Sequence, residues 1–132
     1  MSRVYRLLSS LAVVLLLTGS QAAAGNSPSI TGKWRIVCNG GPSTEGTIEF
    51  RVTPHEGTPI VVTAKVPKGH SENAVARDIR DAFIAQLDKK RFHVETDDGE
   101  DVLVKRKGDQ PKFLLELVSS GVQNVSLRVK HD

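Results

Sequence analysis

The stretch SENAVARDIRDAFIAQLDKK, residues 71–90, decides the fold because it has clear helical periodicity. Ser71 stands where a helix N-cap belongs, and Glu72 suits the positive end of the helix dipole. Apolar residues recur at steps of three and four along a helix from residue 71 to about 90, and they are Val75, Ile79, Ala82, Phe83 and Leu87. A helix with one apolar stripe needs a partner surface, so we expect it to lie on a β-sheet.

Alternation of apolar and polar side chains predicts strands on both sides of this helix. Three alternating segments precede it and four follow it, around residues 34–38, 48–53, 60–66, 92–94, 102–104, 113–117 and 125–129. Clusters of Gly, Pro, Asn and Asp separate most of them, which is typical of turns. The sequence therefore predicts an α+β fold of order β-β-β-α-β-β-β-β. We expect a mostly antiparallel sheet of hairpins with one amphipathic helix packed on one face.

The register of the hairpin that follows the helix can be argued from its side chains. A two-residue loop, Asp98-Gly99, would place Val94 opposite Leu103. A three-residue loop over residues 97–99 places Val94 opposite Val102 and gathers the apolar side chains of the hairpin on one face. It also puts Gly99 at the left-handed position of a type I turn followed by a bulge. We therefore expect the three-residue loop.

The N-terminal segment has the pattern of a secretory signal peptide. Arg3 and Arg6 precede an apolar run over residues 7–17, and the segment ends in Ala22-Ala23-Ala24, which suits an A-x-A cleavage site. The run is shorter than the roughly 20 apolar residues that span a bilayer, so a retained transmembrane anchor is not expected. We divide the chain into a signal peptide (1–24), a flexible leader (25–29) and a single α+β domain (30–132), and we expect a periplasmic or secreted protein.

Charge and cysteine content limit the possible functions. The chain has 18 Lys and Arg against 15 Asp and Glu, and without Arg3 and Arg6 the balance is 16 against 15. A mature net charge near +1 does not indicate a nucleic-acid-binding protein. Cys38 is the only cysteine, so no intramolecular disulfide can form. Its strand position matches that of Trp34 and Ile36, which predicts a buried thiol; an intermolecular disulfide and a catalytic nucleophile are the alternatives.

No catalytic, metal or cofactor motif is recognisable. His55, His70, His93 and His131 are scattered without the spacing of metal ligands. The acidic residues within 97–101 lack the ligand spacing of a calcium loop, and Asp-Gly is ordinary turn chemistry. Neither a G-x-S-x-G elbow nor a phosphate-binding glycine loop occurs. We therefore assign no catalytic residue, no metal ligand and no cofactor.

Two basic triplets form the strongest candidate binding site, called the basic cluster here. They flank the first hairpin after the helix and consist of Lys89, Lys90, Arg91, Lys105, Arg106 and Lys107. The expected register sets Arg91 opposite Lys105, so the triplets should meet and attract an anionic surface or an acidic partner protein. Alternatively, Lys89 and Lys90 complement the helix C-terminus and the other cations form a solvated edge. Single-stranded nucleic acid is disfavoured, because Phe92 alone could offer an aromatic platform and we expect it to be buried.

These observations favour a small exported, non-catalytic binding module that uses the basic cluster. Two alternatives stay open. One is a small secreted hydrolase whose site includes His55 and Glu56, and the other is a self-assembling surface or structural subunit that pairs through its edge strands. Asn124 begins an N-x-S sequon, which matters only in a eukaryotic secreted protein.

Overall fold

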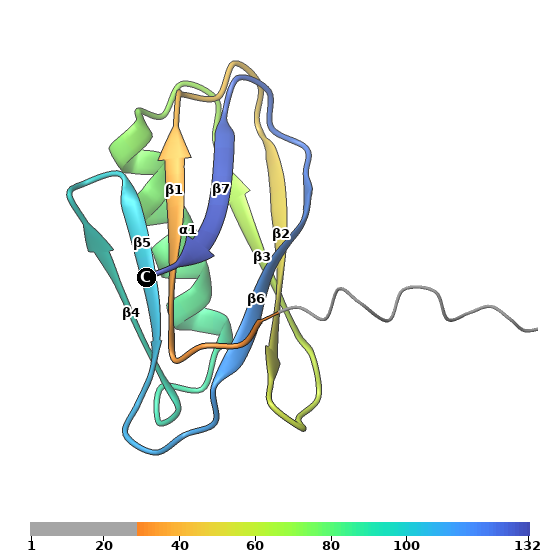
Figure 1. Ribbon diagram of the computed structural model, residues 1–132. Coiled ribbons are helices and arrows are strands. Elements are labelled where there is room, and N and C mark those ends of the chain that lie inside the picture. The colour runs from red at the N-terminus through yellow and green to blue at the C-terminus, as the bar shows by residue number, and fades with distance from the viewer. Residues whose placement is uncertain (1–28) are drawn as a thin grey trace, which may run out of the picture.

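The computed structural model describes residues 29–132, which form two antiparallel sheets and a helix packed against them (Figure 1). The described part of the chain contains seven strands and one long helix in the predicted order, which confirms the α+β class. Their bounds are β1 (Lys33–Asn39), β2 (Gly46–Pro54), β3 (Ile60–Val66), α1 (Glu72–Gln86), β4 (Phe92–Asp97), β5 (Asp101–Arg106), β6 (Phe113–Ser120) and β7 (Ser126–His131). The predicted signal peptide and residues 25–28 of the predicted leader lie outside the described residues.

The strands divide between a four-stranded sheet, β4-β5-β1-β7, and a three-stranded sheet, β3-β2-β6. Neighbours within each sheet are antiparallel. The sheets meet at one end, where Thr31 and Phe113 exchange two backbone hydrogen bonds of 3.1 and 2.9 Å. The indole Nε1 of Trp34 also donates to the Phe113 carbonyl at 2.8 Å. These contacts close one end of the core.

Helix α1 begins as predicted and ends earlier than expected. The Ser71 hydroxyl accepts a hydrogen bond from the Ala74 backbone N–H at 3.2 Å, which makes Ser71 the N-cap. The helix ends at Gln86, and Leu87 has an extended backbone. Asp88 then forms a turn, because its carboxylate accepts from the backbone N–H of Lys90 at 2.9 Å. Lys89 and Lys90 therefore belong to this turn and not to the last helical turn.

The core lies between the two sheets and α1 and is made of apolar side chains. Phe50 of β2 and Phe83 of α1 are fully buried, with ring centroids 5.1 Å apart. Phe92 of β4 and Phe113 of β6 meet edge to face at 5.2 Å. Cys38 is also fully buried, as predicted, and burial raises the pKa of its thiol to about 12. Such a thiol is protonated at neutral pH and enclosed by the core.

The β4–β5 hairpin keeps the predicted inward face but has a different register. Val94 lies opposite Val104 and not Val102, because the loop is formed by residues 98–100 and Asp97 pairs with Asp101. The shift is two residues, so every side chain keeps its face. A contact from another strand accompanies this register, since Arg35 of β1 binds the carboxylates of both Asp97 and Asp101. The expected pairing of Arg91 with Lys105 is therefore wrong.

Within residues 29–132, no helix has the length and apolar character needed to cross a bilayer.

Candidate anion-binding groove beside the basic cluster

The structure brings the two basic triplets to the same end of the four-stranded sheet. Phe92 pairs with Arg106, and the Lys107 backbone N–H donates to the Arg91 carbonyl at 2.9 Å. The Asp88 carbonyl accepts from the backbone N–H groups of Arg91 and Phe92, both at 3.0 Å. The turn after α1 is thus hydrogen-bonded to the start of β4, which fixes the first triplet beside the second.

A hollow of about 250 Å³ lies between the end of α1 and β4, and we call it the α1–β4 groove. Apolar side chains from both elements form most of its lining, and cations from both triplets complete it. The lining residues are Phe83, Ile84, Leu87, Lys89, Phe92, His93, Val94 and Lys107. The groove therefore combines an apolar surface with two positive charges, an arrangement suited to a ligand that has both apolar and anionic groups.

Four cations of the basic cluster form neither an ion pair nor a side-chain hydrogen bond among residues 29–132. They are Lys89, Lys90, Arg91 and Lys107. Of the four, Arg91 is half-buried, with its guanidinium carbon 5.7 Å from the centroid of the Phe92 ring. Lysine side chains with no local counter-charge remain available to an external anion.

The other two cations are engaged within the protein. The Lys105 ammonium lies 2.8 Å from the Glu95 carboxylate, and this contact, followed by that of His93, lowers the pKa of Glu95. The Arg106 guanidinium donates to the Gln110 carbonyl at 3.0 Å. Of the six residues predicted as a binding site, these two have structural partners already.

The acidic end of the same hairpin is partly neutralised within the protein. On the outer face of the sheet, Arg35 of β1 forms ion pairs with Asp97, Asp101 and Asp132, and Lys33 binds Asp132 at 2.7 Å. The pKa of the Asp132 carboxyl is lowered, first by its hydrogen bond with Arg35 and then by Lys33. Among residues 29–132, no group of three or more His, Cys, Asp or Glu is arranged to hold a metal ion.

His55 and Glu56, the candidate residues of a hydrolase, lie in the exposed turn between β2 and β3. Their side chains are 60% and 85% exposed, and His55 Nε2 is 3.8 Å from Glu56 Oε2. Glu56 has a positive φ of 57°, as expected for a tight turn. With both side chains in solvent, this pair lacks the water-excluded surroundings that strengthen acid–base catalysis.

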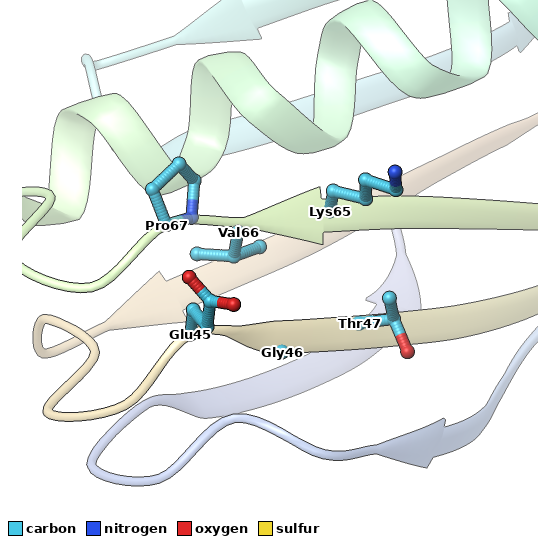
Figure 2. Close-up of a pocket in the computed structure, with 6 residues that line it drawn as sticks. All are labelled: Glu45, Gly46, Thr47, Lys65, Val66 and Pro67. Atoms are coloured by element: carbon cyan, nitrogen blue, oxygen red, sulfur yellow. The ribbon is translucent and has the colours of Figure 1, made fainter.

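A second hollow, of about 350 Å³, lies where β2 begins and β3 ends (Figure 2). Val66, Pro67 and Gly46 form its apolar part, and Glu45 and Lys65 supply one charge of each sign. Figure 2 shows the Glu45 carboxylate beside Val66, whereas the Lys65 side chain extends along β3. Sequence reasoning missed this hollow and the α1–β4 groove, because both depend on elements that pack together only in the folded chain.

Comparisons of the chain with protein-family models, with curated proteins and with solved structures found no match.

Proposed function

We propose that this protein is an exported, non-catalytic binding module that recognises an acidic partner protein through the basic cluster and the α1–β4 groove. One observation carries the proposal. Lys89 and Lys107 come from different triplets, form no ion pair among the described residues, and both line a hollow with an apolar floor. The apolar floor favours a polypeptide, because a simple anion or a purely polar surface would leave it unfilled.

Direct binding to a defined acidic peptide tests this proposal. The probe is a fluorescent peptide of eight residues that alternates glutamate with valine or leucine, and its anisotropy is followed as the purified protein is added. The test variant replaces Lys89, Lys90, Arg91 and Lys107 with glutamine. We expect its affinity to fall about tenfold or more, because about 1.4 kcal/mol spread over four charges at the surface is a typical electrostatic contribution.

A matched control keeps the same change of net charge elsewhere on the molecule. It replaces four exposed cations that form no ion pair among residues 29–132, namely Lys68, Arg77, Arg128 and Lys130. We expect this variant to bind the peptide like the wild type. Equal weakening of peptide binding in both variants would show that only the net charge of the protein matters. The proposed site would then be wrong.

Vesicles distinguish a protein partner from an anionic membrane. Phosphatidylglycerol vesicles replace the peptide in a co-sedimentation assay with the same three proteins. We expect the peptide to bind more tightly than the vesicle surface, because a headgroup layer presents charge without an extended apolar chain. Binding to vesicles with no binding to the peptide would contradict the proposed partner class.

Self-assembly is a second candidate, and exposed apolar residues on β6 favour it. This strand is an edge of the three-stranded sheet, and Leu117 and Val118 are 37% and 41% exposed. An unpaired edge with apolar side chains can pair with another copy. Light scattering of the purified protein tests this function: a concentration-dependent rise in mass that Val118→Lys abolishes would support it, and a constant monomer mass would exclude it.

A further inference from the structure

Strand β4 has a free edge beside the basic cluster. It is the outermost strand of the four-stranded sheet, and within residues 29–132 it pairs with β5 alone. Figure 1 shows β4 at the border of that sheet, with α1 on the core side. An edge strand presents a row of backbone N–H and C=O groups that can pair with another chain.

The hydrogen bonds of β5 establish which backbone groups of β4 face this edge. The Arg106 N–H donates to the Gly32 carbonyl at 2.9 Å, so Arg106 turns its backbone toward the β1 side, and its neighbour Lys107 donates to Arg91 at 2.9 Å. Backbone direction alternates along an antiparallel ladder. His93 and Glu95 therefore bond with β5, and the residues between them direct their backbone groups away from it.

Three residues of β4 thus face the free edge. The Phe92 N–H is already used, since it donates to the Asp88 carbonyl at 3.0 Å. The Phe92 carbonyl and both backbone groups of Val94 and Thr96 have no hydrogen-bond partner among residues 29–132. These five groups form a short, continuous template for one added strand.

The edge of β3, on the other side of α1, is covered by a side chain. The Gln86 side chain accepts from the Thr63 N–H at 2.9 Å and donates to the Thr63 carbonyl at 2.8 Å. One amide therefore occupies the place that a neighbouring strand would take. Comparable coverage of Val94 and Thr96 does not occur among the described side chains.

A strand added at the edge of β4 would have one apolar and one polar face. Residues directly opposite each other in an antiparallel pair point to the same face. A residue opposite Val94 would point toward the apolar lining of the α1–β4 groove, beside Ile84 and Leu87. Its neighbours would point to the outer face, where β4 presents His93 and Glu95, the latter paired with Lys105. At the start of β4 the added strand would approach Arg91 and Lys107, which form no ion pair among residues 29–132. The edge is therefore complementary to a strand that alternates apolar and acidic residues and whose acidic residues lie near the start of β4.

We propose that β4 binds an extended segment of a partner protein as an additional antiparallel strand, with apolar side chains on the apolar lining of the α1–β4 groove and acidic side chains near Arg91 and Lys107 at the start of β4. This inference rests on the proposed function and adds the mode of recognition. Main-chain hydrogen bonds would give affinity, and alternating side chains would give selectivity.

Backbone N-methylation of the peptide probe tests strand addition directly. Two isomers of the glutamate–valine/leucine peptide are compared, one N-methylated at two central apolar residues and the other at the two glutamates beside them. Antiparallel pairing directs the amides of the apolar residues to β4, so we expect the first isomer to lose affinity about tenfold or more and the second to bind like the parent. Equal affinities, or loss with the glutamate isomer alone, would overturn the proposal.

A matched pair of proline variants tests the same edge from the protein side. Thr96→Pro removes an N–H that faces the open edge of β4, a position where proline is tolerated. Val129→Pro is the control, because the Asp132 N–H donates to Lys33 on β1 and alternation turns the Val129 N–H away from β1. We expect weaker peptide binding only with Thr96→Pro, with both variants keeping the far-UV dichroism of the wild type.

Failure of the inference differs from failure of the proposed function. If the four-cation variant loses affinity while both N-methylated isomers bind like the parent peptide, the proposal of an acidic partner is supported and that of strand addition is wrong. If the four-cation variant keeps full affinity, both are wrong. If either proline variant unfolds, the comparison of the two peptides with the wild-type protein still decides the question.

Discussion

Replacing Arg35 with leucine should destabilise the protein most strongly near neutral pH. Arg35 connects the two ends of the β4–β5 loop with Asp132, and its side chain is only 17% exposed. The contacts with Asp101 and Asp132 involve carboxylates of similar exposure, whereas Asp97 is solvent-screened at 41%. Counting about 1 kcal/mol for each of the two shielded contacts and little for the third, we expect a loss of about 2 kcal/mol.

The pH dependence of this loss follows from the lowered pKa of Asp132. A carboxyl whose pKa is lower in the folded state stabilises the fold above its unfolded value of about 3.9, and this stabilisation disappears as the pH falls through the lower folded value. The pKa of Arg35 is raised, so this residue stays charged throughout the acid range. Wild type and Arg35→Leu should therefore differ at about pH 7 and converge at about pH 2.

Urea unfolding followed by the fluorescence of Trp34, the single tryptophan, measures both proteins across this range. The control is Arg128→Leu, which removes an exposed cation that forms no ion pair among residues 29–132. We expect the control to cost less than about 0.5 kcal/mol. A loss of 2 kcal/mol in Arg35→Leu that persists unchanged at low pH would refute the electrostatic explanation and point to packing of the arginine side chain.

Three further predictions concern other parts of the chain. Cys38 in the folded protein should not react with a thiol reagent at pH 8, because its thiol is buried and its pKa is raised to about 12; reaction at the rate of a free thiol would contradict the fold around it. Gln86→Ala should lower the free energy of unfolding by about 1–2 kcal/mol through the loss of two hydrogen bonds with Thr63, and urea unfolding against Gln86→Glu shows whether the amide donor matters. Mass spectrometry of the exported protein should show a chain that begins at Gly25, and a mass that includes residues 1–24 would exclude the predicted cleavage.

Local signals in the sequence were sufficient for the element types. Ser71 and the apolar stripe predicted α1, and strict alternation predicted the strands. The end of α1 was missed because Asp88 bonds to the backbone of the following turn, a local alternative that competes with helix. Helical periodicity continued to Leu87, so the pattern itself contained no stop signal before this residue.

Long-range contacts account for what the sequence could not predict. The observed register of the β4–β5 hairpin is accompanied by contacts of Arg35, which lies more than 60 residues before Asp101 and could not be paired with it from local patterns. The division into two sheets depends on β1–β7 and β2–β6 pairings between distant segments. The basic triplets were visible in the sequence, but the groove beside them was not, because it exists only where α1 ends against β4. Burial of Cys38 was predictable because it follows from strand parity alone.

The Gln86 amide restrains the position of α1 and so affects the α1–β4 groove, which it does not line. Its two bonds with Thr63 hold α1 to β3 on one side, while the α1–β4 groove opens on the other. Any ligand that needs a wider groove must displace the helix toward β3 or break this clamp. Gln86 therefore restrains the helix from the side opposite the groove. We expect a substitution there to let the groove admit larger side chains, although Gln86 does not line it.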